Sequence, residues 1–222
     1  MVKTGFVILV TGRPDRLDEA LACISAEAKD GSSIVCVVDQ AHRQYAGEII
    51  ECSGAHVTAV YSDLSSEGAG SALNKAIKLT EGEAVFLITR MVTLPPGFVA
   101  ACAEKLFSSG SVGFVYASYI EEKGDEESFI ETRTDNYDFS ESSKIGPVRA
   151  IRREAFETVG YYDPSLRYAF DYDLRVRIFE KYDLAALDGA VYRILHSGDD
   201  ANNHDPALPR SSYTNYTSEE EA

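Results

Sequence analysis

A carboxylate and a glycine-rich run in the first half of the sequence have the type and position to bind a nucleotide or a phosphate. Asp39 directly follows the apolar run 34–38. A carboxylate at the end of a buried strand can accept hydrogen bonds from a base imide or a ribose hydroxyl, although a turn or capping role explains Asp39 equally well. The run 68–73 begins like the phosphate-binding pattern GxGxxG, but Leu73 stands where the third glycine is needed. We therefore interpret it as a loop leading into a helix.

The elements that would position Asp39 are predicted by alternating apolar runs and helical patterns, which are typical of an α/β fold with a mostly parallel sheet. In such sheets ligands bind at the carboxyl ends of the strands. The charged run 121–127 is predicted to be a solvated turn or loop, and the polar residues from 199 on to lie on the surface or to be disordered. Strands are expected at 6–10, 34–38, 57–61, 84–88 and 112–120, and helices from 14 to about 28 and at 47–52, 71–80, 98–107, 153–159 and 173–182.

Composition and charge exclude several classes of protein. The 222 residues include 21 Lys and Arg against 36 Asp and Glu, a formal charge of -15 that opposes binding to nucleic acid or to an anionic membrane. The apolar run 6–10 is too short for a spanning helix or a signal peptide, so we expect a cytoplasmic protein with no transmembrane segment. The four cysteines form no CxxC pair and are expected to be reduced and structural.

The second half of the chain carries a run of paired residues at fixed spacing. These are Arg152-Arg153, Phe156-Glu157, Val159-Gly160, Tyr162-Asp163 and the stretch Asp171-Tyr172-Asp173-Leu174-Arg175-Val176-Arg177. In order and spacing they resemble the carboxyl-terminal half of the family 2 glycosyltransferases of the GT-A fold. The likeness extends to Val37-Val38-Asp39, to Asn74-Lys75-Ala76-Ile77 and the residues up to Leu87, to Thr93-Leu94-Pro95-Pro96-Gly97-Phe98, and to Tyr192-Arg193 followed by His196.

This resemblance implies a single GT-A-like α/β domain over residues 1–198. Its nucleotide-binding half would be 1–96 and its acceptor half 97–198, with 199–222 as a polar tail. The implied activity is that of an inverting glycosyltransferase, which moves a sugar from a UDP-, GDP- or dTDP-sugar to a glycan or lipid-linked acceptor hydroxyl. The alternative is a non-catalytic GT-A-like domain that binds a glycan, a nucleotide or a protein partner. Sugar-nucleotide synthesis fits less well, because Gly12-Arg13-Pro14 lacks a long Gly-rich, Lys-containing loop.

The resemblance also implies roles for particular residues. Asp171 stands where members of the family carry the base that deprotonates the acceptor hydroxyl, although it could instead only pair with Arg175, and Asp173 is interpreted as a helix-start residue. Arg152, Arg153 and His196 could contact an acceptor or a phosphate, although a solvated helix start explains the two arginines and a surface position explains the histidine. The implied nucleotide-binding residues are Thr11, Arg13, Asp39, Thr89 and Arg90.

The metal motif of the family is the main departure. Its Asp-x-Asp should fall at Ile88-Thr89-Arg90, where neither carboxylate is present. The family implies Mg²⁺ or Mn²⁺, which prefer oxygen ligands that Ile88 and Arg90 lack, so no metal ligand is assigned and weak metal dependence is expected. Arg90 could instead pair with a diphosphate, or it could neutralise Asp39, Asp171 or another acid. The first member of the family's acidic pair is Phe170.

Overall fold

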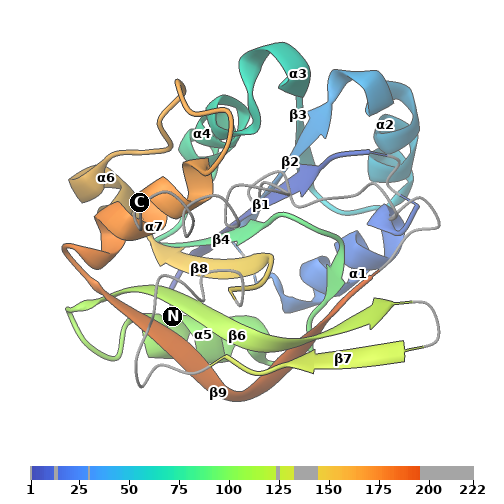
Figure 1. The fold of residues 1–222 in the computed structure, drawn as a ribbon. Coiled ribbons are helices and arrows are strands. Elements are labelled where there is room, and N and C mark those ends of the chain that lie inside the picture. The colour runs from blue at the N-terminus through green and yellow to red at the C-terminus, as the bar shows by residue number, and fades with distance from the viewer. Residues whose placement is uncertain (1, 13–14, 30, 124–125, 133–144, 196–222) are drawn as a thin grey trace, which may run out of the picture.

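The described residues form one nine-stranded sheet that is covered by helices on both faces (Figure 1). The computed structural model describes residues 2–12, 15–29, 31–123, 126–132 and 145–195. The strand order is β3-β2-β1-β4-β8-β6-β9-β5, and β7 pairs with β6 outside this path. Strands β1, β2, β3 and β4 pair with one another in parallel. Strand β8 runs antiparallel to both β4 and β6. The α/β class expected from the apolar pattern is therefore confirmed.

The first half of the chain alternates strands and helices as the sequence predicts. Its elements are β1 (Thr4–Val10), α1 (Leu17–Glu27), β2 (Ser33–Asp39), the short 3-10 helix η1 (Gln40–His42), α2 (Arg43–Cys52), β3 (Val57–Ser62), α3 (Leu64–Glu67), α4 (Ala69–Leu79), β4 (Ala84–Ile88) and β5 (Val92–Thr93). The glycine-rich run 68–73 lies at the start of α4, where Gly68 is the N-cap with φ +80°. It is thus mostly helical rather than a loop before the helix.

The second half contains more strand than the sequence predicts. Its elements are α5 (Phe98–Leu106), β6 (Val112–Lys123), β7 (Glu126–Ile130), β8 (Val148–Arg152), α6 (Arg153–Val159), α7 (Phe170–Phe179) and β9 (Asp183–Ile194). The turn or loop predicted over 121–127 was wrong at both ends, because Glu121 and Glu127 lie in the β6–β7 ladder. Each of these acids pairs with an arginine, Glu121 with Arg90 and Glu127 with Arg193, which offsets their charge.

Two helical layers give the sheet two separate cores. Helices α1, α2 and α5 cover one face, and α4, α6 and α7 cover the other. Successive strand residues alternate between the layers, so Phe6 and Ile8 of β1 join the first core while Val7 and Leu9 join the second. Each core contains residues from both halves of the chain.

Helix α7 begins three residues earlier than expected, at Phe170. The ring of Phe170 is 1% exposed and packs edge-on against Tyr162, with ring centroids 5.4 Å apart. Its N-cap, Ala169, has φ +55°, an uncommon value for a residue other than glycine. The early start places both Asp171 and Asp173 in the first turn of the helix.

No helix in the described ranges is long and apolar enough to cross a membrane. The polar tail predicted at 199–222 lies outside the described residues.

Candidate functional site

The carboxyl ends of the parallel strands bring four of the predicted site residues to one edge of the sheet. Thr11 follows β1, Asp39 ends β2, and Thr89 and Arg90 follow β4. Strand register confirms this common edge, because Val10 is level with Val38 and Ile8 is level with Ile88. We call it the carboxyl edge. Arg13 lies outside the described residues.

Asp39 is half-buried and serves as the N-cap of η1. Its Oδ1 atom accepts a hydrogen bond from the backbone N–H of Ala41 at 3.2 Å. The structure describes no hydrogen bond to its Oδ2 atom. Asp39 therefore has the turn-capping role considered above, and it retains one carboxylate oxygen that can accept a hydrogen bond from a ligand.

Arg90 has an acidic partner within the protein. Its Nη1 atom lies 2.7 Å from Oε1 of Glu121 on β6, and both side chains are 19% exposed. The acid that Arg90 neutralises is therefore Glu121, and it is neither Asp39 nor Asp171. Thr89 is 2% exposed, and its backbone N–H donates to the carbonyl of Pro147 at 3.0 Å. The Arg90–Glu121 pair is therefore more accessible than Thr89.

The residues at the position of the metal motif do not fit a divalent cation. Ile88 is 1% exposed and belongs to the core, and Arg90 presents a cation. In the parts of the chain that the structure describes, no three His, Cys, Asp or Glu side chains form a group that could hold a metal ion. The donor set thus lacks the oxygen ligands that Mg²⁺ and Mn²⁺ require.

Asp171 lies in a buried cluster under α7. Its side chain is 2% exposed, and its Oδ1 and Oδ2 atoms lie 3.3 Å from Arg149 Nη1 and 3.2 Å from Arg175 Nε, respectively. The hydroxyl of Tyr162 donates to Oδ1 at 3.3 Å. Both guanidinium groups are 1% exposed. A general base must be within hydrogen-bond reach of the proton that it removes, and here the carboxylate faces arginines and a tyrosine inside the protein.

Arg149 was missed by the sequence analysis, whereas Arg175 was considered there as a partner of Asp171. Arg149 lies in β8, level with Leu87 of β4, and its side chain is held inside the protein beside Asp171. An arginine within the apolar run 148–151 was the available signal, because a charge in a buried strand requires a partner. Arg175 follows Asp171 by four residues, the spacing at which helical side chains meet.

Asp173 is a half-exposed residue with a structural contact. Its Oδ2 atom accepts hydrogen bonds from Arg177, at 3.0 Å from Nε and 2.6 Å from Nη2. Arg177 also donates to the backbone carbonyls of Val159 and Tyr161. The pair therefore ties the first turn of α7 to the end of α6, as expected for a residue at a helix start.

Arg152 and Arg153 lie at the opposite edge of the sheet. Arg152 is level with Ala84, the first residue of β4, whereas the carboxyl edge lies beyond its last residue. Arg152 donates to the carbonyls of Leu106 and Ser109 at 2.7 and 2.8 Å, and Arg153 donates to carbonyls at the end of α4. The two arginines close the C-terminal ends of α5 and α4, away from Asp39, and their contact with an acceptor or a phosphate stays a prediction. His196 lies outside the described residues.

No family model and no curated protein matches this sequence. Solved structures do match. Residues 1–349 of TarS from S. aureus align with a TM-score of 0.67 and 16% identity, over 86% of this chain and 60% of that one. The mannosyltransferase PcManGT from Pyrobaculum calidifontis, in complex with GDP-Man and Mn²⁺, aligns with a TM-score of 0.63 and 16% identity, over 97% and 59%. GalNAc-T7 with UDP, GalNAc and Mn²⁺ aligns with a TM-score of 0.67 and 15% identity, over 97% and 48%.

These likenesses show the fold. The chain has the GT-A glycosyltransferase fold over most of its length, and it spans about half to three fifths of these three chains. The expectation of this fold from the paired residues of the second half is confirmed.

Proposed function

We propose that this GT-A domain binds a nucleotide or nucleotide sugar at the carboxyl edge, around Asp39, and that it does not transfer the sugar. The burial and ion pairing of Asp171 are the observation that supports the absence of sugar transfer. Its carboxylate is 2% exposed and lies between Arg149 and Arg175.

Transfer to an acceptor by direct displacement needs a carboxylate that can take a proton from the incoming hydroxyl. Asp171 could do so only after leaving its arginines. Breaking a buried ion pair costs about 3 to 5 kcal/mol, because it leaves buried charge uncompensated. This cost favours a structural role for Asp171 in this chain.

Nucleotide binding is supported by the free oxygen of Asp39 and by its position at the end of a central parallel strand. The solved neighbours add support, since TarS has also been solved with UDP-GlcNAc and the other two structures contain GDP-Man and UDP. The unsuitable donor set at Ile88 and Arg90 favours binding without a divalent ion. The ligand class is therefore UDP, GDP, dTDP or one of their sugars.

Calorimetry with these nucleotides and nucleotide sugars tests the proposal, with Mn²⁺ in one series and a chelator in the other. We expect binding that is equal in the two series, and no donor hydrolysis or sugar transfer over the same donor panel. Absence of binding at millimolar nucleotide would overturn the proposed ligand. Turnover would overturn the non-catalytic assignment.

An inverting glycosyltransferase is the second candidate, favoured by the presence of an aspartate at the start of α7, where the resemblance implies the base. Under this candidate Asp171→Asn lowers kcat by roughly 100-fold or more and changes donor affinity little. The parent must show turnover for this comparison to be made, and parental turnover that survives in Asp171→Asn would exclude Asp171 as the base.

A further inference from the structure

The surface formed by α2 and the outer edge of β3 has features of a protein interface. Strand β3 is at the end of the strand order, and within the described residues it pairs only with β2. It contains no charged residue and no proline, and its register with β2 is continuous. Charged side chains, prolines and bulges are devices by which exposed edge strands are usually protected from pairing with another chain, and β3 has none of them. The backbone edge of β3 is therefore competent to pair.

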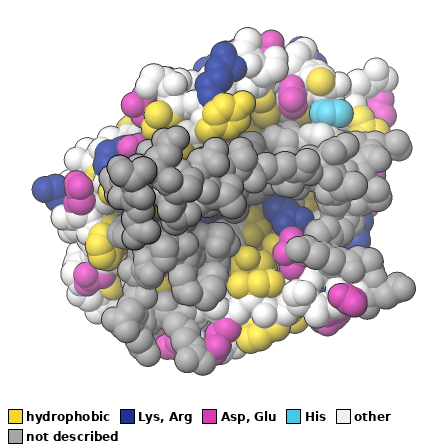
Figure 2. Space-filling view, in the orientation of Figure 1, with side chains coloured by type: hydrophobic (Ala, Val, Ile, Leu, Met, Phe, Trp, Pro, Cys, Tyr) yellow, Lys and Arg dark blue, Asp and Glu magenta, His cyan; other side chains and the backbone are white. Residues whose placement is uncertain are grey.

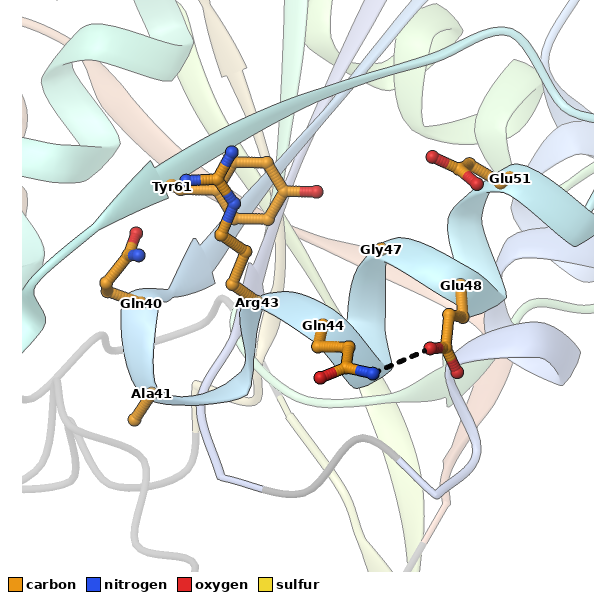
Figure 3. A pocket seen from close by; sticks show the side chains of 8 residues that line it. All are labelled: Gln40, Ala41, Arg43, Gln44, Gly47, Glu48, Glu51 and Tyr61. Carbon is orange, nitrogen blue, oxygen red and sulfur yellow. Dashed lines mark hydrogen bonds between the residues drawn. The ribbon is translucent and has the colours of Figure 1, made fainter.

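Helix α2 presents one face beside this edge. The face borders an open hollow of about 580 Å³ (Figure 3). Its residues recur at helical spacing along α2 and the preceding turn, and Tyr61 of β3 completes the lining. The lining residues are Gln40, Ala41, Arg43, Gln44, Gly47, Glu48, Glu51 and Tyr61.

Arg43 and Glu51 carry opposite charges at the two ends of this face. The guanidinium of Arg43 lies over the ring of Tyr61, 4.6 Å from its centroid (Figure 3). The described part of the chain gives neither Arg43 nor Glu51 an ion-pair partner. The stack holds the Arg43 cation in place, so its charge is ordered before any partner arrives.

Gly47 lies midway between the two charges, four residues from each. A Cβ atom at Gly47 would lie 3.1 Å from the hydroxyl of Tyr61, so glycine allows α2 to lie close to β3. Helix α2 returns antiparallel to β3, because it connects two parallel strands. The eight residue steps from Arg43 to Glu51 span ~12 Å of helix, and the four steps from Val57 to Tyr61 span ~13 Å of strand. The charges therefore lie level with the two ends of the strand.

We propose that this surface binds a second copy of the chain, with β3 of one protomer pairing antiparallel with β3 of its partner across a two-fold axis. An axis level with Gly47 brings Arg43 of each protomer opposite Glu51 of the partner subunit. Two ion pairs form by the same operation, as an isologous interface requires. The sheets of both protomers become one continuous sheet, and the partner's α2 occupies the hollow. This proposal is independent of nucleotide binding.

Sedimentation velocity of the full chain over a broad concentration range tests the interface. Salt at about 0.15 M limits the range of repulsion between two copies to about 8 Å, which is needed because each copy carries a formal charge of -15. We expect a reversible dimer. A parent that stays monomeric into the millimolar range overturns the proposal.

Charge reversal then identifies the contacts. Arg43→Glu and Glu51→Arg each replace two attractive contacts by two like-charge contacts, so each is expected to weaken the dimer by at least about 100-fold. An equimolar mixture of the two variants restores association as a heterodimer, and the double variant restores a homodimer. Lys29→Glu and Glu104→Arg, which reverse exposed charges outside this surface, leave the dimer unchanged. Single variants that dimerise like the parent, or a mixture that stays monomeric, overturn the assignment.

Discussion

Two aspartates predicted as site residues are in opposite physical states. Asp39 is half-buried at the carboxyl edge and uses one oxygen to cap η1. Asp171 is 2% exposed, and both of its oxygens face arginines. The same side chain is available to a ligand in one region and committed to the protein interior in the other. The difference comes from the neighbours, because a carboxylate becomes structural when burial and counter-charge surround it.

The largest expected effect is on stability, at Asp171. Asp171→Ala leaves the guanidinium groups of Arg149 and Arg175 buried without their carboxylate, so the free energy of unfolding should fall by about 3 to 5 kcal/mol. For a domain of this size that lowers Tm by roughly 10 °C. Urea denaturation and calorimetry measure both quantities.

Asp173→Ala is the matched control for this change. It removes a half-exposed pair from the same helical turn, and the free energy of unfolding should fall by less than about 1 kcal/mol. Equal losses of unfolding free energy in the two variants would show that the buried cluster stabilises the fold no more than the half-exposed pair does.

Ligand affinity should respond to Asp39 while stability changes little. Asp39→Ala is expected to weaken nucleotide binding by about 1 to 3 kcal/mol, because a hydrogen-bond acceptor is lost. Asp39→Asn separates this effect from capping, since asparagine is an equally good N-cap but cannot accept at both oxygens. Calorimetry should show weaker binding in both variants, with nearly parental unfolding in Asp39→Asn, which keeps the cap. If both bind like the parent, Asp39 has only its capping role.

The buried thiol of Cys36 should make the free energy of unfolding depend on pH. Burial raises the pKa of Cys36 to about 12, whereas an unfolded cysteine ionises near 8.5. Between these pH values the unfolded state has lost a proton that the folded state keeps, so stability is present below pH ~8.5 and is lost as pH rises toward 12. Cys36→Ala should reduce this slope by up to about 1.4 kcal/mol per pH unit.

Unfolding titrations at pH 8, 9 and 10 measure the slope, and Cys52→Ala serves as the control because Cys52 is exposed. An unchanged slope in Cys36→Ala would show that its thiol is not protected from ionisation in the folded protein.

Arg90 should give the smallest effect. Arg90→Met removes the partner of Glu121 from a pair that is 19% exposed. We expect a loss of about 1 kcal/mol in unfolding free energy and a change of less than about twofold in nucleotide affinity. Glu121→Gln, with the same stability loss, is the companion variant. A large loss of nucleotide affinity in Arg90→Met alone would instead show that its guanidinium contacts the diphosphate.

Local pattern predicted the first half of the fold well. The runs that became β1, β2 and β4 are apolar on both faces, and such runs form strands wherever a helical layer covers each face. The second half was harder to predict because most of its strand pairs are antiparallel and its strands carry charges. Arg149 and Glu121 interrupt the apolar pattern of β8 and β6, and their partners Asp171 and Arg90 are distant in sequence.

The candidate site divides in the same way. Asp39 could be placed from its own strand, because the end of a parallel strand has a defined position in the sheet. Arg152 and Arg153 could not be placed in this way. The edge of the sheet at which they lie depends on the direction of β8, which runs antiparallel to β4. A pattern match does not report strand direction, so it left open at which edge of the sheet the two arginines lie.

The sequence by itself determined the α/β class, the likeness to the GT-A fold and the loss of carboxylates at Ile88 and Arg90, because each depends on residue type and local spacing. Only the tertiary structure decided the state of Asp171, Arg90 and Asp39. Availability of a charged group depends on burial and on the opposite charges that other elements bring within about 4 Å, where Coulomb energies become large. Those elements are β8 for Asp171 and β6 for Arg90. They reach these positions only when the strands pair in the folded sheet.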